Sequence, residues 1–193
     1  SRIYLVMLTK DEQETIASLL RAGFEMDDIP AILGNIDVET GGTYSHTQKE
    51  KDGKGYGLFQ FTGSHKKDYF DWLTNSSLID GKDSQAKFVY DNIWGSKGYG
   101  RELGWRDRSK LQTILEEDMT ANPHIANPTK RKAKTFSNVY ERPRTPHLEK
   151  RMLSAEKWEK RLDVKKPPTL APVGMMSSGP NKRSSRGGRK KPS

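Results

Sequence analysis

Glu39 lies just before the glycine pair Gly41-Gly42, at the end of a predicted helix, and this position suits a proton donor. At 100° per residue, Glu39 lies roughly 60° from Ile36, at the edge of that helix's apolar stripe. Partial burial and the negative end of the helix dipole both favour the protonated form of a carboxyl group. An acid that keeps its proton near neutral pH can protonate the leaving oxygen of a glycosidic bond.

The helix period alone does not single out Glu39. Asp37 lies about 100° from Ile36 by the same arithmetic, so it is a second carboxylate near the stripe. A glutamate at the end of a helix is also most often a solvated residue. The residues alone therefore leave both interpretations open.

A second segment could face this acid across a cleft. Residues 49–55 are typical of a turn between two short extended segments, and residues 56–61 are the best strand candidate in the chain, so the two predict a small β-hairpin. Gln60 is polar inside this apolar strand and needs a hydrogen-bond partner if it is buried. Asp52 is a possible second carboxylate, which an inverting hydrolase needs ~6.5–9.5 Å from its acid. Its place before Gly53 equally fits a structural turn, and that interpretation is favoured.

The elements that must position these residues are mostly short helices. Thr9 and Glu12 fit a capping box that starts a helix ending at Gly23. Asp27 or Asp28 can cap the helix that carries Glu39. Further helices are expected over residues 64–73, 84–94, about 111–119, 130–140 and 146–162. The predicted fold is α+β and mostly helical, a single domain over residues 1–163 with one small β-hairpin.

The basic character of the chain belongs to its last thirty residues. The formal net charge is +9, with 34 Lys and Arg against 25 Asp and Glu. Residues 164–193 hold eight of the basic residues and no acid, which leaves 26 against 25 in residues 1–163. Such a segment buries too little to order itself, so a disordered basic tail is expected. It could contact nucleic acid or anionic envelope surfaces, or serve as a linker.

Several kinds of site are not expected. The chain has no cysteine, and its four histidines form no spaced ligand pair, so no metal and no cofactor are predicted. The longest apolar run, residues 3–8, is too short for a membrane span or for the core of a signal peptide.

Two segments resemble the phage tail lysozyme family, which belongs to the lysozyme-like superfamily with goose-type lysozymes and lytic transglycosylases. They are residues 33–42, Leu-Gly-Asn-Ile-Asp-Val-Glu-Thr-Gly-Gly, and residues 55–63, Gly-Tyr-Gly-Leu-Phe-Gln-Phe-Thr-Gly. A third, residues 136–143, looks like the family's closing motif, and the helix after it is similar too. The likeness covers about residues 10–162. Three positions depart from the usual family pattern: Thr40 replaces Ser, Phe61 replaces Trp, and Lys66 or Lys67 replaces Arg.

The resemblance implies roles for named residues. Glu39 would be the general acid toward the MurNAc-GlcNAc β-1,4 bond of peptidoglycan. Tyr56 and Gln60 would hydrogen-bond the sugar, and Phe61 would offer an apolar platform. Judged from the residues alone, Tyr56 and Phe61 fit a core position equally well. Glu141 is interpreted as a structural ion-pair partner.

The expected function is therefore a virion-associated enzyme that opens the host cell wall during infection and genome delivery. Hydrolysis and lytic transglycosylation both stay open. The expected partners are peptidoglycan and other phage virion or tail proteins. One alternative is a basic DNA- or virion-associated structural protein with an inert lysozyme-like body. Another is a peptidoglycan-binding module without turnover, which the intact Glu39 disfavours.

Overall fold

The computed structural model describes residues 8–50, 52–94, 117, 120–141, 143 and 145–162. The predicted basic tail and most of the helix predicted at 111–119 lie outside these residues. The described part is mostly helical: α1 (Lys10–Ala22), α2 (Ile29–Thr40), α3 (Gly63–Asn75), α4 (Lys82–Trp94), α7 (Pro128–Thr135), the π-helix η2 (Phe136–Glu141) and α8 (Leu148–Arg161).

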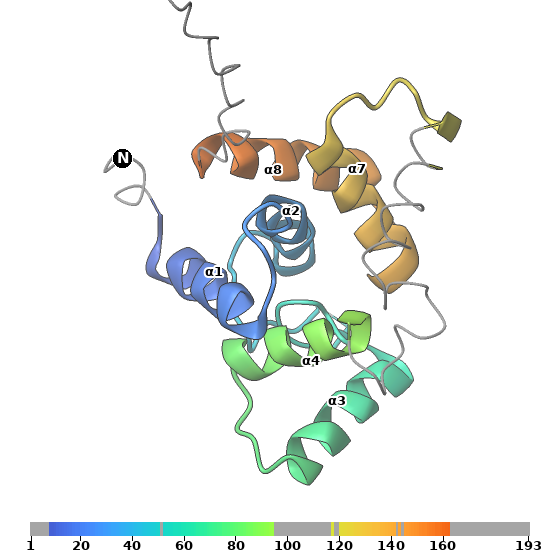
Figure 1. Ribbon diagram of the computed structural model, residues 1–193. Helices are drawn as coiled ribbons and strands as arrows, with labels where there is room; N and C mark the ends of the chain where they lie inside the picture. The colour runs from blue at the N-terminus through green and yellow to red at the C-terminus, as the bar shows by residue number, and fades with distance from the viewer. Residues whose placement is uncertain are drawn as a thin grey trace, which may run out of the picture.

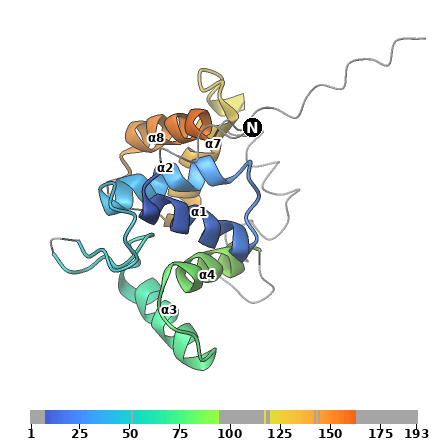
Figure 2. The same cartoon turned by 90° about the vertical axis from the view of Figure 1, so that its left-hand side faces the viewer.

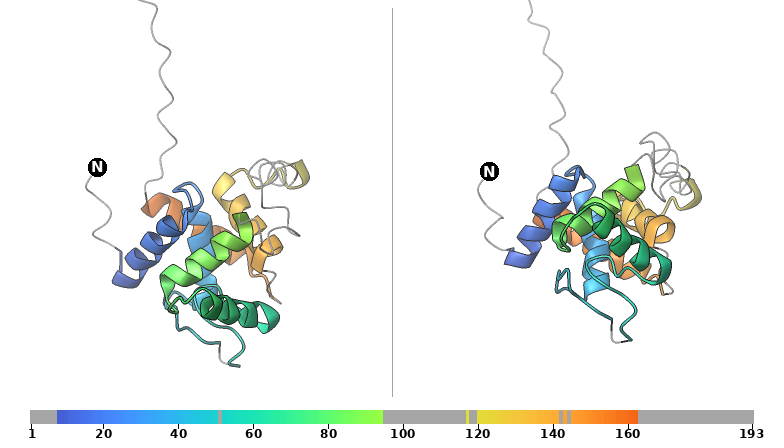
Figure 3. Two further views of the ribbon diagram at one scale, coloured as in Figure 1. Left: turned by 60° about the horizontal axis from the view of Figure 1, so that its bottom comes forward. Right: turned by 90° about the horizontal axis from the view of Figure 1, so that it is seen from below.

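Helix α2 is the centre of the fold (Figure 1). Helix α8 packs along it, α7 packs against both, and α1 lies between α2 and α4. All eight residues from 29 to 36 are buried. A helix that is apolar on all sides is expected to be buried in this way. Its C-terminal end leads into the segment of residues 41–62, which projects beside α3 (Figures 2 and 3).

The predicted ends of the first two helices are largely confirmed. The Thr9 hydroxyl accepts a hydrogen bond from the Glu12 amide at 3.1 Å, and Gly23 ends α1 with a φ of 116°. Gly41 ends α2 with a φ of 60°. Asp28 is the N-cap of α2, but its side chain makes no capping hydrogen bond there. Its carboxylate instead pairs with the Lys132 ammonium at 2.9 Å.

The predicted strand and hairpin are wrong. Residues 56–61 form a tight turn in which the amides of Tyr56 and Phe61 each bond to the other's carbonyl, at 3.1 and 2.9 Å. Gln60 has a φ of 46° and Gly57 a φ of 80°, and neither conformation fits a strand. Within the described residues, the β pairing amounts to one isolated antiparallel bridge between Lys49 and Tyr56. The fold is therefore mostly helical, without the predicted α+β hairpin.

The helix predicted at 130–140 consists of two parts. Asn127 caps α7, since its Oδ1 accepts from the amides of Thr129 and Lys130 at 2.8 and 3.1 Å. From residue 136 the chain continues as the wider π-helix η2. Sequence periodicity near 3.6 does not distinguish such a segment from an α-helix.

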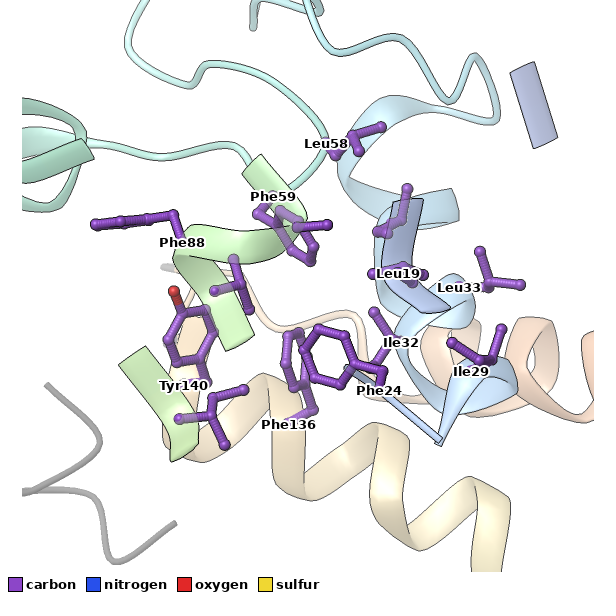
Figure 4. Close-up of a cluster of buried hydrophobic side chains, with 14 of the residues drawn as sticks. Leu19, Phe24, Ile29, Ile32, Leu33, Leu58, Phe59, Phe88, Phe136 and Tyr140 are labelled. Atoms are coloured by element: carbon purple, nitrogen blue, oxygen red, sulfur yellow. The ribbon is translucent and has the colours of Figure 1, made fainter. Parts of the chain in front are cut away.

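Aromatic side chains from distant segments meet in the core (Figure 4). Phe59 lies 6.4 Å from Phe136 between ring centroids, and Phe136 lies 5.3 Å from Tyr140. Phe61 packs at 4.9 Å from Tyr69 and is only 1% exposed. The expectation of Phe61 as a sugar platform is thus corrected: its ring is enclosed by other aromatic rings and has no free face.

Candidate active site

A cleft of about 550 Å³ opens where α2 ends. Its walls come from four segments distant in the sequence: the last turn of α2, the segment of residues 50–62, the end of η2 and the beginning of α8. The lining residues are Val38, Glu39, Glu50, Asp52, Lys54, Phe59, Gln60, Thr62, Glu141, Pro143, Thr145, His147 and Arg151. Of the predicted site residues, Glu39, Asp52 and Gln60 share this cleft, whereas Tyr56 and Phe61 do not line it.

Glu39 is held in the cleft wall by a buried cation. Its side chain is 11% exposed, and its Oε1 lies 2.5 Å from Nη2 of Arg151. The Arg151 side chain is only 2% exposed. Its Nη1 donates to Glu141 at 2.6 Å and to Asn35 Oδ1 at 3.0 Å, and its Nε donates to the Pro146 carbonyl at 2.6 Å. These bonds fix the position of the guanidinium group beside Glu39.

The Leu-Gly-Asn-Ile segment of α2 explains how α8 reaches the acid. A Cβ at Gly34 would lie 2.6 Å from the Ala155 amide nitrogen, so only glycine permits this approach of the two helices. Asn35 is fully buried, and its Nδ2 donates to the carbonyls of Ala31 and Ala133 at 2.9 and 3.1 Å. Its Oδ1 is thereby oriented toward Arg151. One turn of α2 therefore sets both the helix contact and the position of the cation.

Glu141 is the second carboxyl group on the same cation. Its side chain is 3% exposed, and its Oε2 lies 2.6 Å from Arg151 Nη1. Burial raises the pKa of Glu141 well above its ordinary value, and the neighbouring Glu39 carboxylate raises it further, whereas Arg151 lowers it. Its buried Oε1 accepts no hydrogen bond from any described residue.

Asp52 lies in the opposite wall, in the turn predicted for it. Its Oδ1 accepts from the Lys54 amide at 3.1 Å, and the Lys54 ammonium lies 3.5 Å from its Oδ2. The hydrogen bond from that amide holds the pKa of Asp52 below its usual value. Burial raises the pKa of the nearby Glu50, and the negative charges of Asp52 and Glu39 raise it further. Both loop carboxyl groups thus face the cleft.

Gln60 closes the tight turn and lines the cleft. It is 7% exposed, and its Nε2 donates to the carbonyls of Gly57 and Gln48 at 2.7 and 3.2 Å. A Cβ at Gly55 would lie 2.2 Å from Gln60 Oε1, so a larger residue there would displace the Gln60 side chain. The hydrogen-bond partners that Gln60 needs when buried are therefore backbone carbonyls of the loop that contains it.

Tyr56 is not a lining residue of the cleft and instead contacts α3 and the segment before α4. Its hydroxyl donates to the Asp80 carboxylate, which also accepts from the Tyr69 hydroxyl at 2.6 Å and from Gln85 Nε2 at 3.1 Å. Burial and the bond to Asp80 raise the pKa of Tyr56 to about 12. Gln85 in turn accepts from the Leu58 amide at 2.9 Å. This network attaches the loop of residues 55–61 to α4.

Two cleft residues are not evident as site residues in the sequence. Arg151 carries no motif of its own, and the sequence indicates Glu141 only as a structural ion-pair partner. The spacing of residues on α8 gives one indication that Arg151 is buried. Arg151 precedes Ala155 and Trp158 by four and seven residues, so it lies on the buried face of this helix. An arginine on such a face needs buried acceptors, and acidic partners are the strongest of these.

Two other classes of site find no support in the described part of the chain. No group of three or more His, Asp or Glu side chains there is arranged to hold a metal ion. None of the described helices combines the length and the apolar character that crossing a membrane requires.

Comparison with known proteins identifies the family. A search of curated proteins gave no match to this chain. The family described as phage tail lysozyme matches residues 10–162, which include every element that lines the cleft. That family suggests a lysozyme-like, cell-wall-degrading role with peptidoglycan as the substrate, and it implies a phage-associated protein. Since the match spans most of its length, the chain belongs to the phage tail lysozyme family.

Proposed function

We propose that this protein cleaves the glycan strand of bacterial peptidoglycan at the MurNAc-GlcNAc β-1,4 bond, with Glu39 as the general acid. One observation carries the proposal: Glu39, at the end of the central helix, lies in the wall of a cleft of about 550 Å³. Its side chain is largely buried and is held by Arg151. A carboxyl group fixed in this way can be aimed at one bond of a bound strand.

The chemistry needs one proton and one nucleophile. Glu39 gives its proton to the glycosidic oxygen as the bond from that oxygen to the anomeric carbon breaks. Water then attacks the anomeric carbon in a hydrolase, whereas the sugar's own 6-hydroxyl attacks it in a transglycosylase. The carboxylates of Glu50 and Asp52 line the opposite wall, where a water could be activated.

The test compares the wild type with Glu39→Gln on purified peptidoglycan, with mass spectrometry of the soluble fragments. Gln keeps the shape of Glu39 but cannot act as an acid, so release of disaccharide-peptides should fall by about 100-fold or more. Asp37→Asn is the matched control, because Asp37 lies on the same helix turn and pairs with Ser154 at 2.7 Å. It should keep its activity.

The ends of the fragments decide the reaction type. Reducing ends indicate hydrolysis, and 1,6-anhydro ends indicate transglycosylation. If the wild type binds peptidoglycan but releases nothing, the enzyme proposal fails and a binding module replaces it. If Glu39→Gln is as active as the wild type, another residue is the acid.

We also propose that the enzyme is carried in the phage particle and opens the wall locally during infection and genome delivery. Membership of a tail lysozyme family supports this place. Mass spectrometry of purified particles should then detect the protein in each particle preparation. Its presence in the lysate but not in particles would contradict the proposal.

A further inference from the structure

Two carboxyl groups and one cation are buried together at the edge of the cleft. Arg151 contacts Glu39 through Nη2 at 2.5 Å and Glu141 through Nη1 at 2.6 Å. With both carboxylates ionised, the three groups carry a net charge of −1. An uncompensated buried charge is costly, and binding one proton removes it.

The hydrogen bonds indicate where such a proton would lie. Glu141 Oε1 is buried and accepts no hydrogen bond from a described residue. The carboxyl groups of Glu39 and Glu141 lie on neighbouring nitrogens of one guanidinium group, and a hydrogen bond to Glu39 is among the causes that raise the pKa of Glu141. A proton between them supplies the missing donor. The raised pKa of Glu141, caused first by burial and then by the Glu39 carboxylate, agrees with this arrangement.

We infer that Glu141 is a positioning residue for the acid: it holds Arg151 against Glu39 and shares a single proton with Glu39. This inference rests on the proposed function. When Glu39 passes the shared proton to the glycosidic oxygen, both carboxylates are left ionised against one cation. That state favours return of a proton from the attacking nucleophile, water in a hydrolase or the sugar 6-hydroxyl in a transglycosylase, as its oxygen bonds to the anomeric carbon, and this restores the acid for the next cleavage.

Four other titratable groups in the described part of the chain face the same cleft. Glu50, Asp52 and Lys54 come from the loop after α2, and His147 precedes α8. The test must therefore change the carboxyl group of Glu141 and leave these four groups in place.

The experiment measures kcat/KM on peptidoglycan across pH for the wild type, for Glu141→Gln and for the control Glu149→Gln. Glu149 is exposed at the start of α8. Glu141→Gln leaves Arg151 in contact with the Glu39 carboxyl group and removes the competing carboxylate. The alkaline limb of the profile should move about one pH unit or more toward acid. The control should keep the wild-type limb.

A merely structural role predicts another result. Glu141→Gln would then lower stability or activity at every pH and leave the alkaline limb in place, which would overturn the inference. If the variant does not fold, carbon-13 NMR titration of the wild-type carboxyl groups takes its place. Shared titration requires the Glu39 and Glu141 signals to respond to the same two steps. Two independent single steps would overturn it.

The two proposals fail in distinguishable ways. If Glu39→Gln remains active, the proposed function fails, whatever Glu141 does. If Glu39→Gln is inactive but the Glu141→Gln profile matches the wild type, the acid stands and only the role of Glu141 is wrong.

Discussion

Gly34 in α2 lies directly against the backbone of Ala155 in α8. A Cβ at Gly34 would come within 2.6 Å of both the Ala155 amide nitrogen and the Arg151 carbonyl oxygen. Both are backbone atoms, so neither can move aside as the end of a flexible side chain can. The distance between these helices, and with it the reach of Arg151 to the acid, depends on the absence of one methyl group.

Gly34→Ala should therefore destabilise the protein. Forcing a methyl group into this contact should lower the free energy of unfolding by about 2–3 kcal/mol, measured by denaturant titration. Gly81→Ala is the matched control, since a Cβ there meets nothing within 4 Å and Gly81 has no positive φ. Equal effects in both variants would show that the α2–α8 contact is not the cause.

The stability of the protein should depend on pH through Glu141. Its pKa is raised by burial and by the Glu39 carboxylate, so the folded state holds a proton more strongly than the unfolded chain. This contribution is complete below the unfolded pKa, near 4.3, and is lost as pH rises through the raised folded pKa.

Thermal unfolding of the wild type and of Glu141→Gln between pH 4 and 8 measures this effect. The variant should be similar to the wild type at low pH, and its relative stability should improve as pH rises, because Gln cannot ionise. If the variant instead becomes less stable than the wild type as pH rises, the folded state favours the ionised form of Glu141.

Asp52→Asn should keep most of the activity and the stability. Asn can still accept the hydrogen bond from the Lys54 amide that forms the turn, which lies at 3.1 Å in the wild type. Asp52→Ala removes this acceptor and should lower the stability slightly. A general base usually contributes about 100-fold or more, so a loss of that size in Asp52→Asn would assign Asp52 as the base.

Tyr56→Phe should act on stability more than on cleavage. The variant removes a donor from the Asp80 carboxylate and should lower the free energy of unfolding by about 1–2 kcal/mol. Tyr90→Phe is the control, because Tyr90 contributes a ring contact with Phe24 at 5.1 Å. A large loss of activity in a stable Tyr56→Phe would restore the predicted contact with the sugar.

Local chemistry made the helix ends predictable from the sequence. The capping hydroxyl of Thr9 and the left-handed glycines Gly23 and Gly41 act over a few residues, and all three lie where they were expected. The strand expected at residues 56–61 was wrong because these residues close a tight turn, with positive φ at Gly57 and Gln60, that packs Phe59 and Phe61 into the core. A short apolar run next to glycines is not unique to strands.

The sequence predicts the site residues on α2 and on the loop that follows it, but not the one on α8. Glu39 and Gln60 stand in segments with a recognisable spacing, and the structure places both in the cleft. Arg151 comes from a helix more than a hundred residues after Glu39, and no local pattern reports which acceptors it will meet. That knowledge requires the packing of α8 on α2, which depends on Gly34.

The π winding of η2 has a consequence for the direction in which Glu141 points. Within residues 136–141 it places Tyr140 in the aromatic core and Glu141, the next residue, at the cation in the cleft. A π-helix turns less per residue than the 100° of an α-helix. Rewinding the same six residues as an α-helix would therefore turn Glu141 away from Arg151 without any change in its identity. Substitutions that favour α winding in this segment should thus disturb the cleft even though they touch none of its side chains.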